Sequence, residues 1–400
     1  MTKKQYYTLN ALKKQVPNFN IAILMSGKGT GKSYTVKCEC IEHYMKNPYR
    51  NGIAYLRRYR DDLTDLKLKR YWADMIRNKD GVNMIAELTH QKYNDIQVAR
   101  GEIYLVKWGK VEKRKRTGFD ADGKAEYDIV EVDEIIDKSP TPFCTAFWLS
   151  ARGYDGLASQ SFPGMYDGIA IVEEFMAQMG SQLDTEPFYL QKILSTIFRD
   201  SEKAKCYLIG NRINRNTNVY AVQWGLTNVS RQKPGTIDTY KFTHYDEVLD
   251  KEVETIIAVE SIKDNGSGNS LIFANRDSIL GDNYDAKPAT NVFRESLDDW
   301  ENIYEICFDT SAGTHYIGKV IVNDEGAMLF HVAPFSNKRK VERHISNIFS
   351  TDQFVSSNFD SRFRIETRIV ELISQGKLCY SDNITASEFE IVLKNLGTIA

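Results

Sequence analysis

One short segment carries the residue types that bind a nucleotide's phosphates. Residues 26–33 read Ser-Gly-Lys-Gly-Thr-Gly-Lys-Ser; an apolar stretch at 21–24 precedes them, and a helical stretch to about Met45 follows. Glycines let backbone N–H groups turn toward phosphates, and the following helix adds its positive N-terminus. The segment therefore predicts a phosphate-binding loop rather than a plain glycine turn. The candidate nucleotide-binding residues are Ser26, Gly27, Lys28, Gly29, Thr30, Gly31, Lys32, Ser33 and Tyr34.

Within this loop, two side chains have defined chemistry. Lys32 suits the terminal phosphates, and the hydroxyl of Ser33 suits Mg²⁺. The usual pattern begins with glycine where this chain has Ser26, so the match is imperfect.

A second predicted strand ends in two acids. Residues 168–175 read Gly-Ile-Ala-Ile-Val-Glu-Glu-Phe, and such an apolar run is typical of a buried parallel strand. Glu173 is the candidate for holding Mg²⁺ through its water shell, and Glu174 for orienting or deprotonating the attacking water. Most such sites use Asp in the first role, so Glu173 must reach one methylene further. The alternative is an ordinary exposed strand end.

Two further polar residues follow predicted elements. Asn211 ends the strand at 206–210, at the edge where ligands bind in doubly wound sheets, although a plain turn residue is an equal alternative. Arg199 follows a predicted helix at 187–198, and on its own it is best interpreted as a charge interacting with the helix dipole.

Length and composition set the outer limits. A chain of 400 residues suits two or three domains, and 42% hydrophobic residues with only 9 Pro exclude a disordered or collagen-like protein. The net charge is −2, yet residues 1–100 hold 19 Lys and Arg against 9 Asp and Glu, which indicates a basic face for an anionic partner.

The first residues of the sequence lack the pattern of a signal peptide, and no run nears the ~18 apolar residues of a membrane span, so we expect a soluble intracellular protein. Neither the 6 Cys nor the 6 His have metal-ligand spacing, so no zinc site is expected.

A basic cluster spans residues 107–116, in a stretch with a turn signal at 121–123 that predicts a long β-hairpin. Sequence-independent phosphate contacts are one interpretation, and a solvated charge run, cancelled by the acidic stretch at 120–137, is the other. The candidate DNA-binding residues are Lys107, Lys110, Lys113, Arg114, Lys115 and Arg116.

Beyond residue 225 the pattern changes. Residues 226–300 are polar and contain a flexible turn at 264–269, which favours a linker domain. Strands are then predicted at 303–308, 316–322 and 327–332, followed by helices near 338–349 and 361–375.

In order along nearly the whole chain, these segments resemble the DNA-packaging ATPases (encapsidation proteins, terminase large-subunit-like) of small short-tailed phages. The segments that carry the resemblance are 5–7, 27–34, 55–60, 149–150, 161–163, 173–175, 196–199 and 206–211. The resemblance implies an α/β fold in three parts: a doubly wound P-loop NTPase sheet of the ASCE/terminase-like type at 1–225, a small linker domain at 226–300, and a vestigial RNase H/nuclease-like α/β domain at 301–400. Lys28 departs from the family, which has arginine there.

The same resemblance implies a function and roles. It implies a motor that uses ATP and Mg²⁺ to translocate double-stranded viral DNA into a procapsid as a homo-oligomeric ring, a pentamer in the family. The implied partners are the portal and, in some relatives, a structural packaging RNA, with no membrane. The implied location is the host cytoplasm, transiently at the portal vertex, and not the mature virion. Lys32, Ser33, Glu173 and Glu174 keep the roles above, Asn211 couples nucleotide state to movement, and Arg199 and, less firmly, Arg60 are fingers inserted into a neighbour's site.

Asp309 resembles the first metal-binding acid of terminase nucleases, with Asp360 and Asp382 as candidate later ones. Two-metal cleavage needs converging carboxylates, and the nearest family does not cut DNA, so we expect no nuclease activity. Two alternatives stay open: a headful-type terminase with an active metal-dependent nuclease, and a P-loop protein that uses nucleotide only as a switch.

Overall fold

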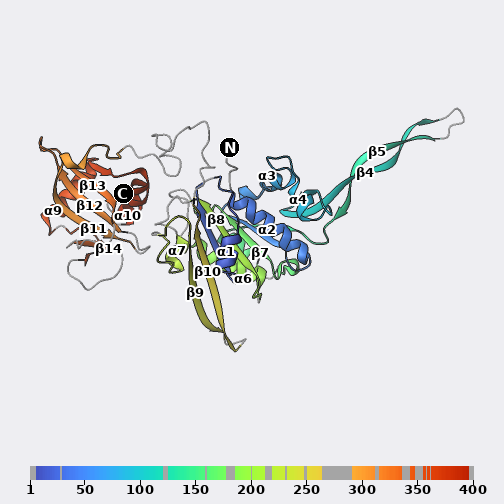
Figure 1. Cartoon of the computed structure of the whole chain (residues 1–400), viewed down its shortest axis with the longest axis horizontal. Coiled ribbons are helices and arrows are strands. Elements are labelled where there is room, and N and C mark those ends of the chain that lie inside the picture. Colours follow the sequence, from blue (N-terminus) through green and yellow to red (C-terminus); the bar gives the residue numbers. More distant parts are fainter. Residues whose placement is uncertain are drawn as a thin grey trace.

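The chain forms two β-sheets with separate hydrophobic cores (Figure 1). The computed structural model describes residues 6–27, 29–119, 125–157, 160–176, 185–199, 201–211, 219–229, 232–246, 250–263, 291–310, 315–335, 343–346, 355–356, 358–360 and 362–395. Among these residues, no helix has the length and apolar character needed to cross a membrane.

The first sheet has ten strands in the order β3-β4-β6-β2-β7-β8-β1-β10-β9, with β5 paired to β4. Its centre is parallel from β6 to β10. The central strands are β1 (Ile21–Ser26), β2 (Ile53–Arg57), β6 (Cys144–Trp148), β7 (Ile169–Glu173), β8 (Lys205–Asn211) and β10 (Lys251–Ser261). Their apolar runs fit burial on both faces, and the predicted doubly wound α/β sheet is confirmed.

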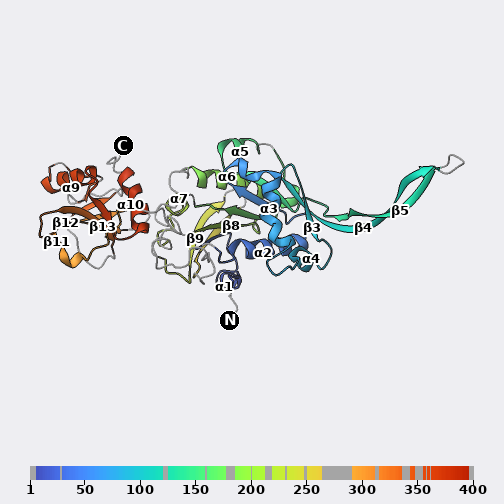
Figure 2. The ribbon, with the colours of Figure 1, turned by 90° about the horizontal axis from the view of Figure 1, so that it is seen from above.

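Helices cover both faces of this sheet, as Figure 2 shows. One face packs against α1 (Asn10–Gln15), α2 (Lys32–Lys46), α3 (Asp65–Ile76) and α4 (Met84–Leu88). The other face packs against α5 (Ala151–Asp155), α6 (Glu186–Phe198) and α7 (Val219–Gln223). Successive β7 residues alternate between the two cores, so Ile171 faces the first group and Val172 the second.

The prediction of a linker domain over 226–300 is wrong for residues 236–261. They form β9 (Thr236–Asp246) and β10, an antiparallel pair in which Ile257 lies beside Ile21 of the phosphate-loop strand. Polar residues dominate because β9 is an edge strand and the first half of β10 is largely exposed. The predicted turn at 264–269 lies outside the described residues.

A long hairpin extends from the opposite edge (Figure 1). Strand β3 (Asp95–Ala99) pairs with β4 (Glu102–Phe119), which pairs with β5 (Ala125–Lys138). The predicted hairpin is therefore confirmed, and its predicted turn at 121–123 lies outside the described residues.

The second sheet has six strands in the order β15-β14-β11-β12-β13-β16. Its strands are β11 (Glu301–Asp309), β12 (His315–Val322), β13 (Met328–Pro334), β14 (His344–Ser346), β15 (Val355–Ser356) and β16 (Leu378–Tyr380). The helices α9 (Arg364–Ser374) and α10 (Asn383–Asn395) contribute side chains to its main core. The three strands and the helix near 361–375 were predicted. The helix predicted at 338–349 is wrong at residues 344–346, which pair with β11 as a parallel strand.

The second sheet and its helices α9 and α10 form the second body of the chain, and the first sheet with its helices forms the first body. The second body begins earlier than the predicted boundary at 301. The backbone N–H of Phe293 donates to the carbonyl of Tyr380 at 2.8 Å, and Val292 bridges the same residue of β16.

Candidate nucleotide-binding site

The loop between β1 and α2 has the backbone that the sequence predicted. Strand β1 ends at Ser26 and α2 begins at Lys32. Gly29 and Gly31 have φ values of 74° and 96°, a region that glycine adopts without strain. A Cβ on Gly31 would also meet the ring of Tyr6 at 3.4 Å. Lys28 lies outside the described residues.

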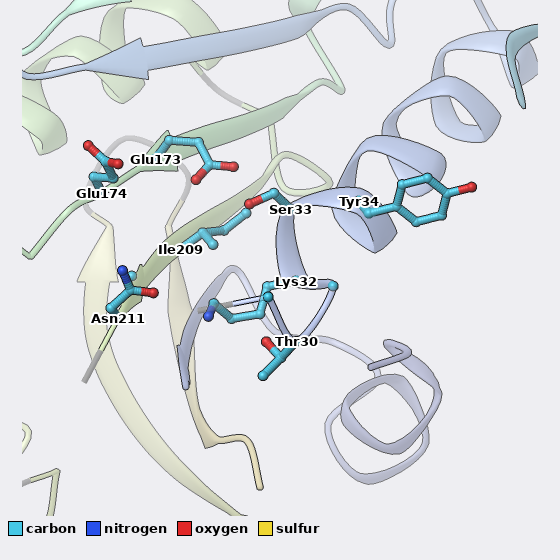
Figure 3. A pocket seen from close by; sticks show the side chains of 11 residues that line it. Thr30, Lys32, Ser33, Tyr34, Glu173, Glu174, Ile209 and Asn211 are labelled. Carbon is cyan, nitrogen blue, oxygen red and sulfur yellow. The ribbon is translucent and has the colours of Figure 1, made fainter. Parts of the chain in front are cut away.

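A cavity of about 350 Å³ opens beside this loop (Figure 3). It lies at the carboxyl ends of the neighbouring strands β7, β8 and β1, where ligands bind in open α/β sheets. The lining residues are Gly29, Thr30, Gly31, Lys32, Ser33, Tyr34, Glu173, Glu174, Ile209, Gly210 and Asn211. The fold thus brings together the loop, the acidic pair and Asn211, which were predicted separately.

Ser26 occupies the place of the pattern's first glycine and takes part in the loop's internal bonding. Its buried hydroxyl donates to the Gly27 carbonyl at 2.8 Å and lies 2.7 Å from the hydroxyl of Thr30. The ammonium of Lys32 donates to the Ser26 hydroxyl and, at 3.1 Å, to the Gly27 carbonyl. In this conformation the lysine is therefore held on its own loop.

Glu173 is buried at the end of β7, on the side of the sheet that α2 and α3 cover. Its carboxylate accepts a hydrogen bond from the Tyr71 hydroxyl at 2.9 Å and points toward the Ser33 hydroxyl (Figure 3). Burial raises the pKa of Glu173, and the hydroxyl groups of Ser33 and Tyr71 oppose the rise. The two candidate Mg²⁺ ligands thus line the same cavity, and hydroxyl and carboxylate oxygens are the ligand types that Mg²⁺ prefers.

Glu174 has a different environment. Its backbone has φ 53°, its side chain is 68% exposed, and the Arg57 guanidinium donates to its carboxylate at 2.9 Å. Figure 3 shows its carboxylate turned away from Ser33, whereas that of Glu173 points toward Ser33. The next arginine, Arg58, donates to the carbonyl of Phe175 at 3.0 Å and pairs with the buried Glu186.

Three residues that contact the acidic pair or its neighbours were not singled out from the sequence. Arg57 and Arg58 lay within the segment 55–60 that carried the resemblance, and Tyr71 was not named. A charged pair at the end of a buried strand was the available signal for the arginines. Nothing local marked Tyr71, whose partner Glu173 is 102 positions away.

The two arginines assigned as fingers do not line the cavity. Arg199 is exposed just after α6, and its guanidinium donates to the Gln160 carbonyl at 3.1 Å. Arg60 is also exposed, with its guanidinium 5.3 Å from the ring centroid of Trp148. Neither arginine therefore reaches the cavity of its own chain in this conformation.

The basic hairpin neutralises part of its own charge. Lys110 pairs with Glu131 at 2.9 Å and Lys113 with Glu134 at 2.8 Å, across β4 and β5. Lys107 donates to the carbonyl of Gln91. DNA contact by this hairpin stays a prediction, and among the described residues Arg114, Lys115 and Arg116 are its exposed basic residues nearest the tip.

The three candidate acids of the nuclease-like domain do not lie together. Asp309 ends β11, Asp360 pairs with Arg362, and Asp382 accepts from the backbone N–H of Thr385 at the start of α10. Among the described residues, these three do not form a group with ligand atoms within 4.8 Å of one another.

No protein-family model matches the sequence, and no curated protein matches it. The solved structures with similar folds include a bacteriophage Phi-29 viral genome packaging motor assembly, with 14% identity, coverage of 98% of this chain and 99% of that chain, and a TM-score of 0.46. The N-terminal domain of the DNA packaging ATPase from bacteriophage phi29 has 18% identity, covering 65% of this chain and 97% of that one, with a TM-score of 0.41. The large terminase of a thermophilic bacteriophage has 11% identity, covering 99% and 87%, with a TM-score of 0.34.

Proposed function

We propose that this chain is an ATPase that translocates double-stranded viral DNA into a procapsid, acting as a homo-oligomeric ring at the portal. The observation that carries the ATPase part is the cavity that Ser33 and Glu173 line together beside the glycine loop, with the Glu173 carboxylate pointing toward Ser33. A hydroxyl and a carboxylate oxygen would hold Mg²⁺ there, and the bound ion would neutralise charge on the phosphates.

The residues of the site divide the work of hydrolysis. Lys32 exchanges its bonds to Ser26 and Gly27 for the terminal phosphates of ATP. Glu174 acts on the attacking water, and because it is paired with Arg57, it does so only after that ion pair opens. Asn211 lines the cavity at the end of β8, and in this proposal it responds to the γ-phosphate.

The ring and DNA parts of the proposal rest on residues outside the cavity. Arg199 is exposed and supplies a cation to the neighbouring subunit, where such a finger raises the rate by about 10³ to 10⁵. Arg60 is the second candidate finger. Arg114, Lys115 and Arg116 on the hairpin contact DNA phosphates without reading sequence, which suits a motor that moves any sequence. A five-membered ring in the host cytoplasm, engaging the portal and in some cases a packaging RNA, completes the proposal.

Steady-state ATP hydrolysis with and without double-stranded DNA tests the proposal. We expect turnover that DNA stimulates and that Glu174→Gln and Arg199→Ala both abolish, while the exposed Arg152→Ala keeps it. Mixing the two inactive variants must restore part of the activity, since one interface then holds an intact Glu174 and an intact Arg199. Nucleotide binding without turnover would favour a switch instead, and no restoration at any ratio would contradict the finger in trans.

A further inference from the structure

The second sheet gathers four side chains of metal-ligating types that the sequence scatters over 38 positions. Cys307 and Asp309 are two apart on β11, so they point to the same face. Asp309 lies opposite His315 in the antiparallel pair with β12, and Cys307 lies beside His344 in the parallel pair with β14. Strand register alone therefore places all four side chains on one face.

This face is the one turned away from the main core of the second body. Ile306 and Phe308 pack into the core with residues of α9 and α10, whereas Cys307 packs with Ile317 in a separate small cluster. Cys307 is buried, and the side chains of Asp309 and His315 are 20% and 17% exposed. An ion can thus reach the cluster from solvent.

The contacts within the cluster centre on Asp309. One carboxylate oxygen contacts Nδ1 of His315 and lies 3.5 Å from Sγ of Cys307, and the other lies 2.8 Å from Nδ1 of His344. The ligand atoms of Cys307, Asp309 and His315 all lie within 4.8 Å of one another. Bonds of about 2.0–2.3 Å to a tetrahedral ion put neighbouring ligand atoms roughly 3.3–3.8 Å apart, so small side-chain rotations are sufficient.

We propose that Cys307, Asp309 and His315 bind one divalent transition-metal ion of the zinc class, while His344 donates to the second oxygen of Asp309 and orients it. A thiolate, an imidazole and a carboxylate form a ligand set for zinc-class ions, whereas Mg²⁺ takes oxygen ligands. A hydrogen bond to a ligand's second atom is the usual outer support of such sites.

The site differs from a two-metal nuclease centre. That centre needs several converging carboxylates, and Asp309 is the only carboxylate that the part of the chain described by the structure brings into this group. The ion would cross-link β11 to β12, so its expected role is to stabilise the second body, independently of the nucleotide site.

Titration of the nucleotide-free full chain with Co²⁺, followed by visible and near-ultraviolet absorption, tests the proposal. We expect one equivalent to bind, with intense tetrahedral bands and a thiolate-to-cobalt band, and Zn²⁺ to displace it. Cys307→Ser should remove the thiolate band. Asp309→Asn, His315→Ala and His344→Ala should each weaken binding by at least about tenfold.

Two variants act as matched controls. Cys379→Ser removes another buried thiol of the same sheet, and His90→Ala removes an exposed imidazole; both should bind Co²⁺ as the wild type does. The wild-type spectrum tests the proposed metal site even where a variant fails to fold. No thiolate band in the wild type, or binding that prefers Mn²⁺ and Mg²⁺ over Zn²⁺, would overturn the proposal.

Discussion

The hydroxyl of Tyr71 donates a 2.9 Å hydrogen bond to Oε1 of Glu173, so a residue of α3 orients the acid at the end of β7. Two contacts fix the position of the Tyr71 ring. Its centroid lies 4.3 Å from the centroid of the Tyr55 ring and 4.3 Å from the ammonium of Lys37. The same carboxylate points toward the Ser33 hydroxyl (Figure 3). In the proposed Mg²⁺ site, Tyr71 would therefore act through Glu173 rather than on the nucleotide.

Tyr71→Phe should therefore weaken Mg²⁺ use. Removing an outer hydrogen bond typically costs about tenfold in metal affinity, so we expect the Mg²⁺ concentration for half-maximal hydrolysis to rise by about that factor. The maximal rate at saturating Mg²⁺ should change much less. A Mg²⁺ titration of hydrolysis at saturating ATP measures both quantities.

Tyr207→Phe is the matched control for this substitution. Tyr207 lies buried on β8 of the same sheet, and its hydroxyl has no hydrogen-bond partner among the described residues. Its removal should leave the Mg²⁺ dependence unchanged. An equal shift in both variants would show that Tyr71 contributes through packing alone.

The parts of the site that sequence could predict are those coded locally. The loop at 26–33 has its own glycines, and Glu173 and Glu174 directly follow an apolar run, so type and spacing were sufficient. Tyr71 and Arg57 could not be assigned, because their roles depend on which strand lies beside β7, a fact of topology rather than of spacing.

The same limit explains the error over residues 236–261. An edge hairpin is polar over much of its surface, so these residues were interpreted as a linker, and only the pairing of β10 with β1 shows that they belong to the first sheet. It also explains why sequence spacing did not indicate the cluster at Cys307, whose members are brought together by strand register.

Ser26→Ala should lower the free energy of unfolding and yet raise the affinity for ATP. The substitution removes the hydroxyl that contacts Gly27, Thr30 and Lys32, and a buried partner lost in this way costs about 1–3 kcal/mol of unfolding free energy. The bond from Lys32 to Ser26 belongs to the free loop, so its loss should tighten ATP binding several-fold. Urea unfolding and a fluorescent-nucleotide titration measure the two effects.

Ser139→Ala supplies the control for that result. Its buried hydroxyl accepts from the Leu105 N–H and donates to the Thr141 carbonyl, away from the cavity. It should destabilise the protein without changing ATP affinity. Weaker ATP binding by Ser26→Ala would mean that the hydroxyl supports the bound loop instead.

Glu173→Gln should lose Mg²⁺-dependent hydrolysis and yet unfold at a higher temperature at pH 7. Burial raises the pKa of Glu173, so the folded chain retains its proton to higher pH than the unfolded chain does. Stability therefore falls as the pH rises from the unfolded-state pKa through the folded-state pKa, and a neutral amide avoids that loss. The difference from wild type should shrink toward pH 4, whereas the exposed Glu87→Gln should show no such trend.

Acidification should destabilise the first body partly through His43. Its Nε2–H donates to the Asp167 carbonyl at 2.7 Å, and burial lowers the pKa of its imidazole below the usual 6.5. As the pH falls through 6.5, His43 binds a proton in the unfolded chain before it does so in the folded chain. The free energy of unfolding must therefore fall. His43→Gln retains an amide donor but cannot titrate, and it should lose less stability than wild type between pH 7 and pH 5. Urea unfolding at the two pH values measures this difference, and the exposed His90→Gln is the control. Equal losses of stability in wild type and His43→Gln would assign the acid sensitivity to other groups.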